Sequence, residues 1–210
     1  MDRIKAFISY SSLNKYIGGE LKQHLTTICG YEPFIAHDDI PGSEIWEKEI
    51  LKAIKTTDFF IPLISKQFKI SDFADQETGL AVCLNKKIIP IKLDTINPYG
   101  FINKYQALQY KQHSIMSVVI AIARIGLHNE PTSIYYKKSL QSLVYALCES
   151  KSFETTNTII QILSTCHHQF SAEQTQQIIE AIRTNSQIIG AFGLRDLKQI
   201  LRTTYHCSLD

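Results

Sequence analysis

The sequence predicts an α/β fold, with a five-stranded parallel sheet flanked by helices, followed by a small all-α domain. Short apolar runs rich in β-branched and aromatic residues alternate with helical patterns up to about residue 125. A polar segment that contains Pro131, residues 128–133, comes next and is typical of a domain boundary. After it the strand signals stop, and four amphipathic helical patterns complete the chain. We therefore expect domains at residues 1–128 and 134–210.

The expected strands are apolar segments that suit a parallel sheet buried on both faces. They lie at residues 4–10, 32–36, 58–64, 87–93 and 106–110. Helices are expected between them, at residues 14–29, from a cap at Ser43, from Ser71 or Asp72 to about Leu84, and from Ser114 to about Ile125. Ligands of such sheets bind beyond the carboxyl ends of the strands. The loops at 10–12 and 37–43 and the segment 65–73 should therefore converge on one cleft.

The second domain is expected to contain only helices. They are predicted at residues 134–148, 153–166, from Ser171 to about Arg183, and 194–205. Ser171 and Gln174 have the spacing of a capping box. The domain carries apolar stripes and no cluster of catalytic residue types, so packing or oligomerisation is its expected role.

Composition excludes several classes of function. The formal net charge is +2 and no Arg-rich run occurs, so no nucleic-acid partner is expected. The apolar run 115–125 is too short to span a bilayer, and the N-terminal residues lack the pattern of a secretory signal. Five cysteines without a CxxC spacing favour reduced thiols in a cytoplasmic protein. No metal is expected, because the adjacent residues Cys166, His167 and His168 would point in different directions on a helix.

Five segments of the first domain, in this order and spacing, carry a resemblance to a known family. They read FISYSS at 7–12, HDDIPGSEIW at 37–46, SDFADQETGLA at 71–81, KIIPIKL at 87–93 and NPYGFINKYQAL at 97–108. Together they resemble TIR (Toll/interleukin-1 receptor) domains, especially those of bacteria, which have a flavodoxin-like fold. The resemblance implies one of two functions. Some TIR domains are adaptors that only assemble, whereas others are NAD glycohydrolases or cyclases, used in bacteria against phage.

Glu77 is the candidate catalytic residue. The family's catalytic pattern is an aromatic residue followed four positions later by Glu, and here it reads Phe73 and Glu77. Positions i and i+4 share one helix face, so both side chains can line one pocket. The usual family aromatic is Trp, and Phe lacks its indole N–H. The alternative is that Glu77 is a first-turn residue favoured by the helix dipole.

One carboxylate is chemically sufficient for cleavage of the nicotinamide–ribose bond. Nicotinamide leaves NAD as a neutral molecule, so no general acid is required. The oxocarbenium-like ribose is the group that needs stabilisation, and a carboxylate beside it supplies negative charge. NAD would be the substrate, and no cofactor is expected.

The resemblance also implies substrate contacts from the sheet edge. Trp46 would stack on the cationic nicotinamide ring, although an amphipathic helix can equally bury such a Trp in its core. Tyr10, Ser11 and Ser12 follow the first strand and would contact the substrate; the alternative is a Ser-rich turn that caps the next helix.

The loop from His37 to Ser43 is the expected cover of the substrate. His37 and Asp38 open it, and in the family this loop also contacts the next subunit. Asp-rich loops are often simple turns, which is the alternative. The resemblance implies head-to-tail homo-oligomers or filaments, together with an upstream sensor or a downstream effector. Glu77 is expected to be well hydrated at an open cleft edge until a neighbouring subunit excludes water.

Overall fold

The computed structural model describes residues 2–35, 46–111, 114–165 and 170–207, with the exception of the Trp46 side chain. The chain forms two compact units whose residues interleave along the sequence. The sheet unit comprises residues 4–25 and 32–122, and the helical unit comprises residues 1–3, 26–31 and 123–210. The predicted domain limits, 1–128 and 134–210, stay a prediction.

The sheet unit contains a parallel sheet, as the sequence predicts. Its strands are β1 (Lys5–Ser9), β2 (Glu32–Phe34), β3 (Phe59–Ile64), β4 (Lys87–Ile88), β5 (Ile91–Lys92) and β6 (Leu108–Gln109). The order is β2-β1-β3-β5-β6, β4 also pairs with β3, and every pair is parallel. The fourth predicted strand is thus two short strands along β3. Pro90 lies between them and has no N–H to donate, so the strand is interrupted there.

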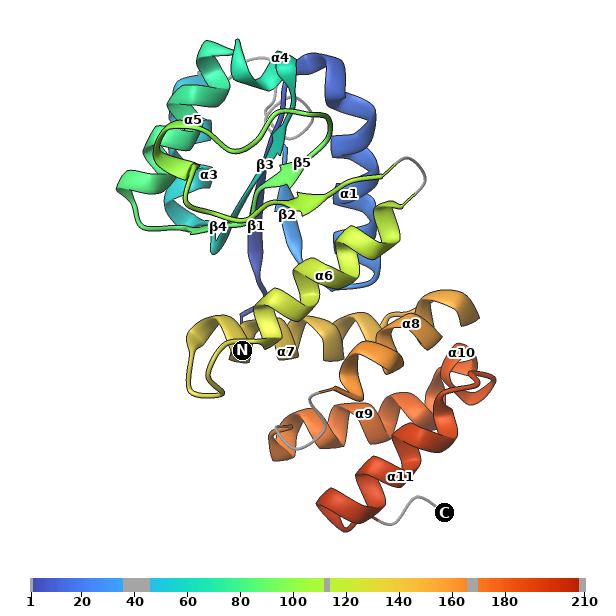
Figure 1. The fold of residues 1–210 in the computed structure, drawn as a ribbon. Coiled ribbons are helices and arrows are strands. Elements are labelled where there is room, and N and C mark those ends of the chain that lie inside the picture. The colour runs from blue at the N-terminus through green and yellow to red at the C-terminus, as the bar shows by residue number, and fades with distance from the viewer. Residues whose placement is uncertain (1, 36–45, 112–113, 166–169, 208–210) are drawn as a thin grey trace. The chain divides into compact units, whose positions relative to one another are not determined.

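Alternation along β1 sends successive side chains to opposite faces of the sheet. The Phe7 ring stacks on Phe34 of β2 and Phe60 of β3, at 5.5 and 5.6 Å between ring centroids. Phe7 belongs to the same apolar cluster as Ile54 of α3 (Trp46–Thr56). Ala81 of α5 (Asp72–Cys83) completes this face of the sheet (Figure 1).

The other face of β1 is covered by α1 (Lys15–Thr27) (Figure 1). Tyr10 lies directly after β1 and packs its ring on Gly18 of this helix, where an added Cβ would lie 3.0 Å from the ring. A glycine inside a helix lowers helix propensity. In the structure the missing side chain of Gly18 makes room for the tyrosine ring.

Short helices connect the remaining elements of the sheet unit. They are η1 (Ser12–Asn14), α4 (Lys66–Lys69) and η2 (Gly100–Ile102), none of which the sequence predicted. The predicted cap of α5 is confirmed, because the Ser71 side chain accepts a hydrogen bond from the backbone N–H of Ala74. The helix predicted from Ser114 to about Ile125 is α6 (Ile115–Leu127), and its residues are divided between the two units.

The helical unit contains the four predicted helices and one short addition. They are α7 (Ile134–Cys148), α8 (Phe153–Leu163), α9 (Ala172–Thr184), α10 (Ser186–Ile189) and α11 (Leu194–Tyr205). The predicted capping box is present, with Ser171 and Gln174 each bonded to the other's backbone N–H. Tyr31 is 0 % exposed, and its hydroxyl donates to Ser139 Oγ at 3.5 Å. Across the described residues, no helix is both long and apolar enough to cross a membrane.

Candidate functional site

The site lies where the connections of the sheet reverse direction. From β1 the chain continues through α1 to β2 on one side, and β3 lies on the other side of β1. In open α/β sheets such a point leaves a crevice outside the carboxyl ends of the two strands. Ser9 is the last residue of β1 and is in register with Pro62 of β3. The crevice is thus defined by backbone topology before any side chain is considered.

Ser9 holds the candidate catalytic carboxylate. Its hydroxyl donates a hydrogen bond to Glu77 Oε2 on α5, at 2.5 Å. Among the described residues, Glu77 Oε1 has no hydrogen-bond partner. One oxygen is therefore fixed by the protein, and the other is available for a ligand.

Ser9 was not among the predicted site residues, although its position inside an apolar strand indicated a special role. Ser9 lies inside the apolar run IKAFISY and is 1 % exposed. A hydroxyl buried in a strand must find a hydrogen-bond partner. Because Ser9 follows Phe7 by two residues, it lies on the sheet face that α3 and α5 cover. The period-2 pattern thus indicates Ser9, rather than Tyr10, as the neighbour of Glu77.

The carboxyl group of Glu77 is partly removed from water. Burial raises the pKa of Glu77 from its ordinary value of 4.5 to about 7, and the hydrogen bond from Ser9 acts in the opposite direction. Glu77 is half-buried, so the single chain already removes part of the water that was expected around this carboxylate. The reason is that α5 presents Glu77 toward Ser9 at the end of β1.

A small hollow of about 120 Å³ adjoins this carboxylate. It is lined by Glu47, Ile50, Leu51, Phe73, Gln76, Glu77 and Leu80. Phe73 and Glu77, one helical turn apart, thus line the same hollow, and the Phe73 ring is 61 % exposed. Pockets for drug-sized ligands usually measure about 300–1,000 Å³, so this hollow can take one end of a dinucleotide. The Glu47 carboxylate on α3, which the sequence did not indicate, faces the same space.

The residues after β1 have separate environments. The Tyr10 ring packs on α1, and exposed Ser12 begins η1. Ser11 donates to Asn14 Oδ1 at 3.0 Å, and Ser65 at the end of β3 donates to the same oxygen at 2.8 Å. Asn14 therefore ties the carboxyl ends of β1 and β3 together. Neither Asn14 nor Ser65 was a candidate from sequence.

Three of the predicted substrate contacts cannot be placed. His37, Asp38 and the Trp46 side chain lie outside the described residues. Substrate contacts by Tyr10, Ser11, Ser12 and Phe73 stay predictions, as does catalysis by Glu77.

Comparison with known proteins decides the family. A family model described as TIR domain matches residues 6–117, which is more than half of the chain. The chain belongs to the TIR domain family. The matched range includes Ser9, Phe73 and Glu77, and it ends within α6, before the remaining helices of the helical unit.

A solved TIR domain has the same fold, and two other solved structures match more weakly. The TIR domain of the Toll-related receptor TRR-2 from Hydra magnipapillata matches at 17% identity and a TM-score of 0.50, covering 59% of this chain and 98% of that chain. A 2-desoxiribosyltransferase from Leishmania mexicana matches at 14% identity and a TM-score of 0.40, covering 55% of this chain and 97% of its own. The CMP N-glycosidase BcmB from Clostridium botulinum matches at 17% identity and a TM-score of 0.39, with coverages of 56% and 97%. No curated protein matches the chain.

Metal-ligating residue types form no candidate cluster among the described residues. Within residues 2–35, 46–111, 114–165 and 170–207, no three His, Cys, Asp or Glu side chains are grouped so that they could hold an ion. Cys166, His167 and His168 lie outside these ranges.

Proposed function

We propose that this TIR domain is an NAD glycohydrolase or ADP-ribosyl cyclase that cleaves the nicotinamide–ribose bond. One observation carries the proposal: Glu77 lies at the switch point of the sheet, with one oxygen held by Ser9. Its other oxygen is available, and the exposed Phe73 ring lines the adjoining hollow. This combination provides an oriented, partly desolvated carboxylate beside an aromatic surface.

The chemistry follows from these groups. The bond between the ribose anomeric carbon and the nicotinamide nitrogen breaks, and its electron pair stays on the nitrogen, so nicotinamide leaves neutral. Positive charge develops on the ribose, where the Glu77 carboxylate stabilises it. A preorganised charge acts more strongly in a partly desolvated site than in water. Water, the adenine of the same substrate, or another nucleophile then captures the ribose carbon.

The pKa of about 7 defines when this group is active. Only the ionised carboxylate stabilises a cation, so activity should fall as pH decreases below 7. Use of the reaction in bacterial anti-phage immunity, by NAD depletion or by a cyclic product, is part of the proposal and rests on the family resemblance.

The test is incubation of the purified chain with NAD, with chromatography of the products. We expect release of nicotinamide, and we expect Glu77→Gln to lower the rate at least 100-fold while the thermal melt is retained. Glu47→Gln is the matched control, because it removes the other carboxylate of the hollow. Wild-type turnover by Glu77→Gln would contradict the assignment. Absence of turnover at any protein concentration would favour the alternative, a scaffold that only assembles.

We also propose that assembly activates the enzyme. The hollow beside Glu77 is too small for a whole dinucleotide, so further walls of the site must come from other residues. In the family the loop at 37–43 of one subunit covers the pocket of the next. Specific activity should therefore rise with protein concentration, and larger oligomers should appear with it. An Ile40→Asp change should suppress both. Equal activity per molecule in dilute monomers, verified by light scattering, would contradict this proposal.

A further inference from the structure

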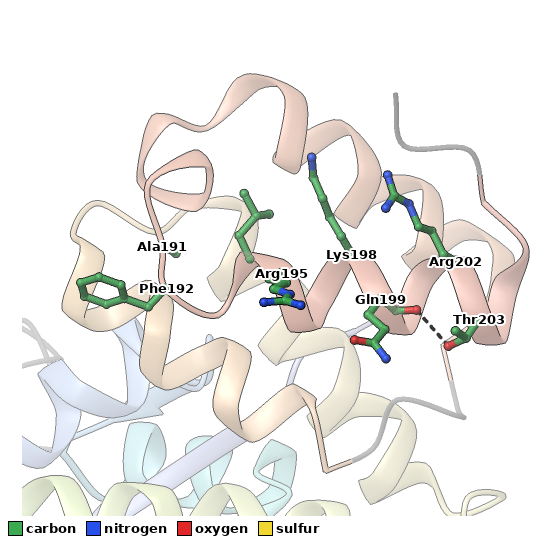
Figure 2. A pocket seen from close by; sticks show the side chains of 8 residues that line it. Ala191, Phe192, Arg195, Lys198, Gln199, Arg202 and Thr203 are labelled. Carbon is green, nitrogen blue, oxygen red and sulfur yellow. Dashed lines mark hydrogen bonds between the residues drawn. The ribbon is translucent and has the colours of Figure 1, made fainter.

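A second hollow, of about 630 Å³, lies within the helical unit along α11 (Figure 2). It is lined by Ala191, Phe192, Leu194, Arg195, Lys198, Gln199, Arg202 and Thr203. Three of these side chains are cations and none is a carboxylate. Asp196, the one acidic residue of α11, does not line the hollow. Its volume falls within the usual range of small-ligand sites, about 300–1,000 Å³.

Two of the three cations, Arg195 and Lys198, lie where α11 gains little from their charge, whereas Arg202 lies in its last turn, where the helix dipole favours a cation. Arg195 and Lys198 are three residues apart and Lys198 and Arg202 four apart, so each pair is a like-charged helical neighbour pair. Arg195 lies in the first turn of α11, where the helix dipole disfavours positive charge. None of the three forms a salt bridge with another described residue. The helix packs through Leu197 and Leu201 instead, which are buried.

The charged side chains are distributed along α11, and Phe192 lies beyond its N-terminal end. Figure 2 shows Lys198 and Arg202 extending from the same side of α11, whereas Arg195 lies nearer the N-terminal end and points in another direction. Arg195 and Arg202 are seven residues apart, which on an α-helix is about 10 Å along the axis. Two guanidinium groups and one ammonium are therefore distributed over about two turns of the helix.

The Phe192 ring is exposed to solvent, and the backbone on both sides of it is fixed by contacts. The ring is 94 % exposed, whereas Ala191 before it is buried. The backbone N–H of Gly193 donates to Asn157 Oδ1 at 3.1 Å, and a Cβ at Gly193 would lie 2.8 Å from the Ile160 side chain. The chain is thus fixed on both sides of an exposed aromatic ring. Leaving such a ring in water forgoes the free energy of burying it, which a stacking ligand would recover.

We propose that this hollow binds a free nucleotide, with its base stacked on Phe192 and its phosphates held by Arg195, Lys198 and Arg202. Arginine forks match phosphate oxygens in pairs, and an aromatic ring accepts any base face. The Gln199 amide adds a donor and an acceptor for the polar edge of the ligand. The site lies in the helical unit and does not depend on the function of Glu77.

The experiment is titration of the full chain with a fluorescent ATP analogue in low-salt buffer. The test variant carries Arg195→Gln, Lys198→Gln and Arg202→Gln. A matched control carries Lys137→Gln, Lys151→Gln and Arg183→Gln, which removes the same charge from exposed positions of the same unit. We expect the test variant to bind at least tenfold more weakly and the control to bind within about twofold of wild type. Equal binding by the test variant would overturn the proposal, because the probe would then occupy another site.

Two competition arms define the ligand class. ATP should displace the probe better than inorganic tripolyphosphate, and Phe192→Ala should weaken ATP several-fold without changing tripolyphosphate. If tripolyphosphate competes as well as ATP and Phe192→Ala changes neither, the hollow is a general anion patch and the proposal fails. Displacement by a ten-nucleotide single-stranded RNA at concentrations where ATP has no effect would indicate a nucleic-acid strand and also overturn it.

Discussion

Buried hydroxyl groups have different partners in the two units. In the helical unit Ser142 and Thr175 bond to carbonyls one helical turn earlier: Ser142 donates to the Lys138 carbonyl at 2.7 Å, and Thr175 donates to the Ser171 carbonyl at 2.9 Å. The Tyr31 hydroxyl, which donates to Ser139, is an exception in that unit. In the sheet unit, Ser9 bonds to Glu77, 68 residues away. Ser65 reaches Asn14 across 51 residues.

The comparison distinguishes hydroxyl groups that only satisfy their own helix from hydroxyl groups that position a side chain of another element. A hydroxyl that bonds to a carbonyl of its own helix has a partner wherever the helix forms, so its hydrogen bond does not indicate a binding site. A hydroxyl that fixes a carboxylate from another element limits that carboxylate to one geometry. By this criterion the sheet unit contains a positioned carboxylate, Glu77, which is the proposed catalytic group. The hollow of the helical unit is defined by exposed charge instead.

The largest expected effect concerns stability of the helical unit. Tyr31→Ala removes a fully buried ring, and such truncations cost about 3–5 kcal/mol. Tyr31→Phe, the control, removes only the hydroxyl that donates to Ser139 and should cost about 1 kcal/mol or less. Urea denaturation followed by circular dichroism measures both. A loss below about 1 kcal/mol for Tyr31→Ala would show that the helices fold independently of residues 26–31, as domain limits of 1–128 and 134–210 require.

A smaller effect is expected from the charge on Glu77. Its pKa is raised in the folded chain, from 4.5 to about 7, so the unfolded chain binds fewer protons between these values. The free energy of unfolding therefore falls as pH rises through this window, by about 2–3 kcal/mol in total. Glu77→Gln should remove this slope and be more stable than wild type at pH 8. Parallel stability curves from pH 4.5 to 8 for the two proteins would contradict the burial of this carboxyl group.

The smallest expected effect tests whether Ser9 positions the Glu77 carboxylate or only packs against it. Ser9→Ala removes the hydrogen bond that lowers the pKa of Glu77, so the acid limb of the proposed NADase activity should move to higher pH. A hydrogen bond to a charged group contributes about 1.5–3 kcal/mol, so activity at pH 6.5 should fall roughly tenfold or more. Activity at pH 8.5 should fall less.

Thr156→Val is the matched control from the helical unit. Thr156 is buried and donates to the Ser152 carbonyl at 2.8 Å, so its loss lowers stability without changing the pH profile. An identical pH profile for Ser9→Ala and wild type would show that Ser9 only packs. A Ser9→Thr variant, which keeps the hydroxyl, should retain the wild-type profile.

Local patterns in the sequence were sufficient for most elements. Period-2 and period-3.6 apolar spacing predicted the parallel sheet and the helices α7, α8, α9 and α11, and Ser171 with Gln174 predicted a cap that the structure contains. The spacing of Phe73 and Glu77 predicted that they share a hollow. These features depend on residues close together in the chain, where geometry is fixed by the element itself.

The features that were missed depend on contacts between distant residues. The partnership of Ser9 with Glu77 requires the placement of α5 over β1, which no local pattern gives. The membership of Tyr31 in the helical unit likewise requires knowledge of which surface α7 covers. The partial burial of Glu77 was not predicted for the same reason, since burial is set by tertiary packing. The split of the fourth strand at Pro90 could have been predicted from its missing N–H.

The bond from Ser9 to Glu77 also has a consequence for protein synthesis. Its two residues are made 68 positions apart, and the carboxylate is held only after β1, β3 and α5 have come together. A ribosome-bound chain that ends before α5 has a complete β1 but lacks Glu77, the proposed catalytic residue. The proposed NAD cleavage therefore requires the folded sheet unit, and the order of translation keeps the growing chain inert toward NAD.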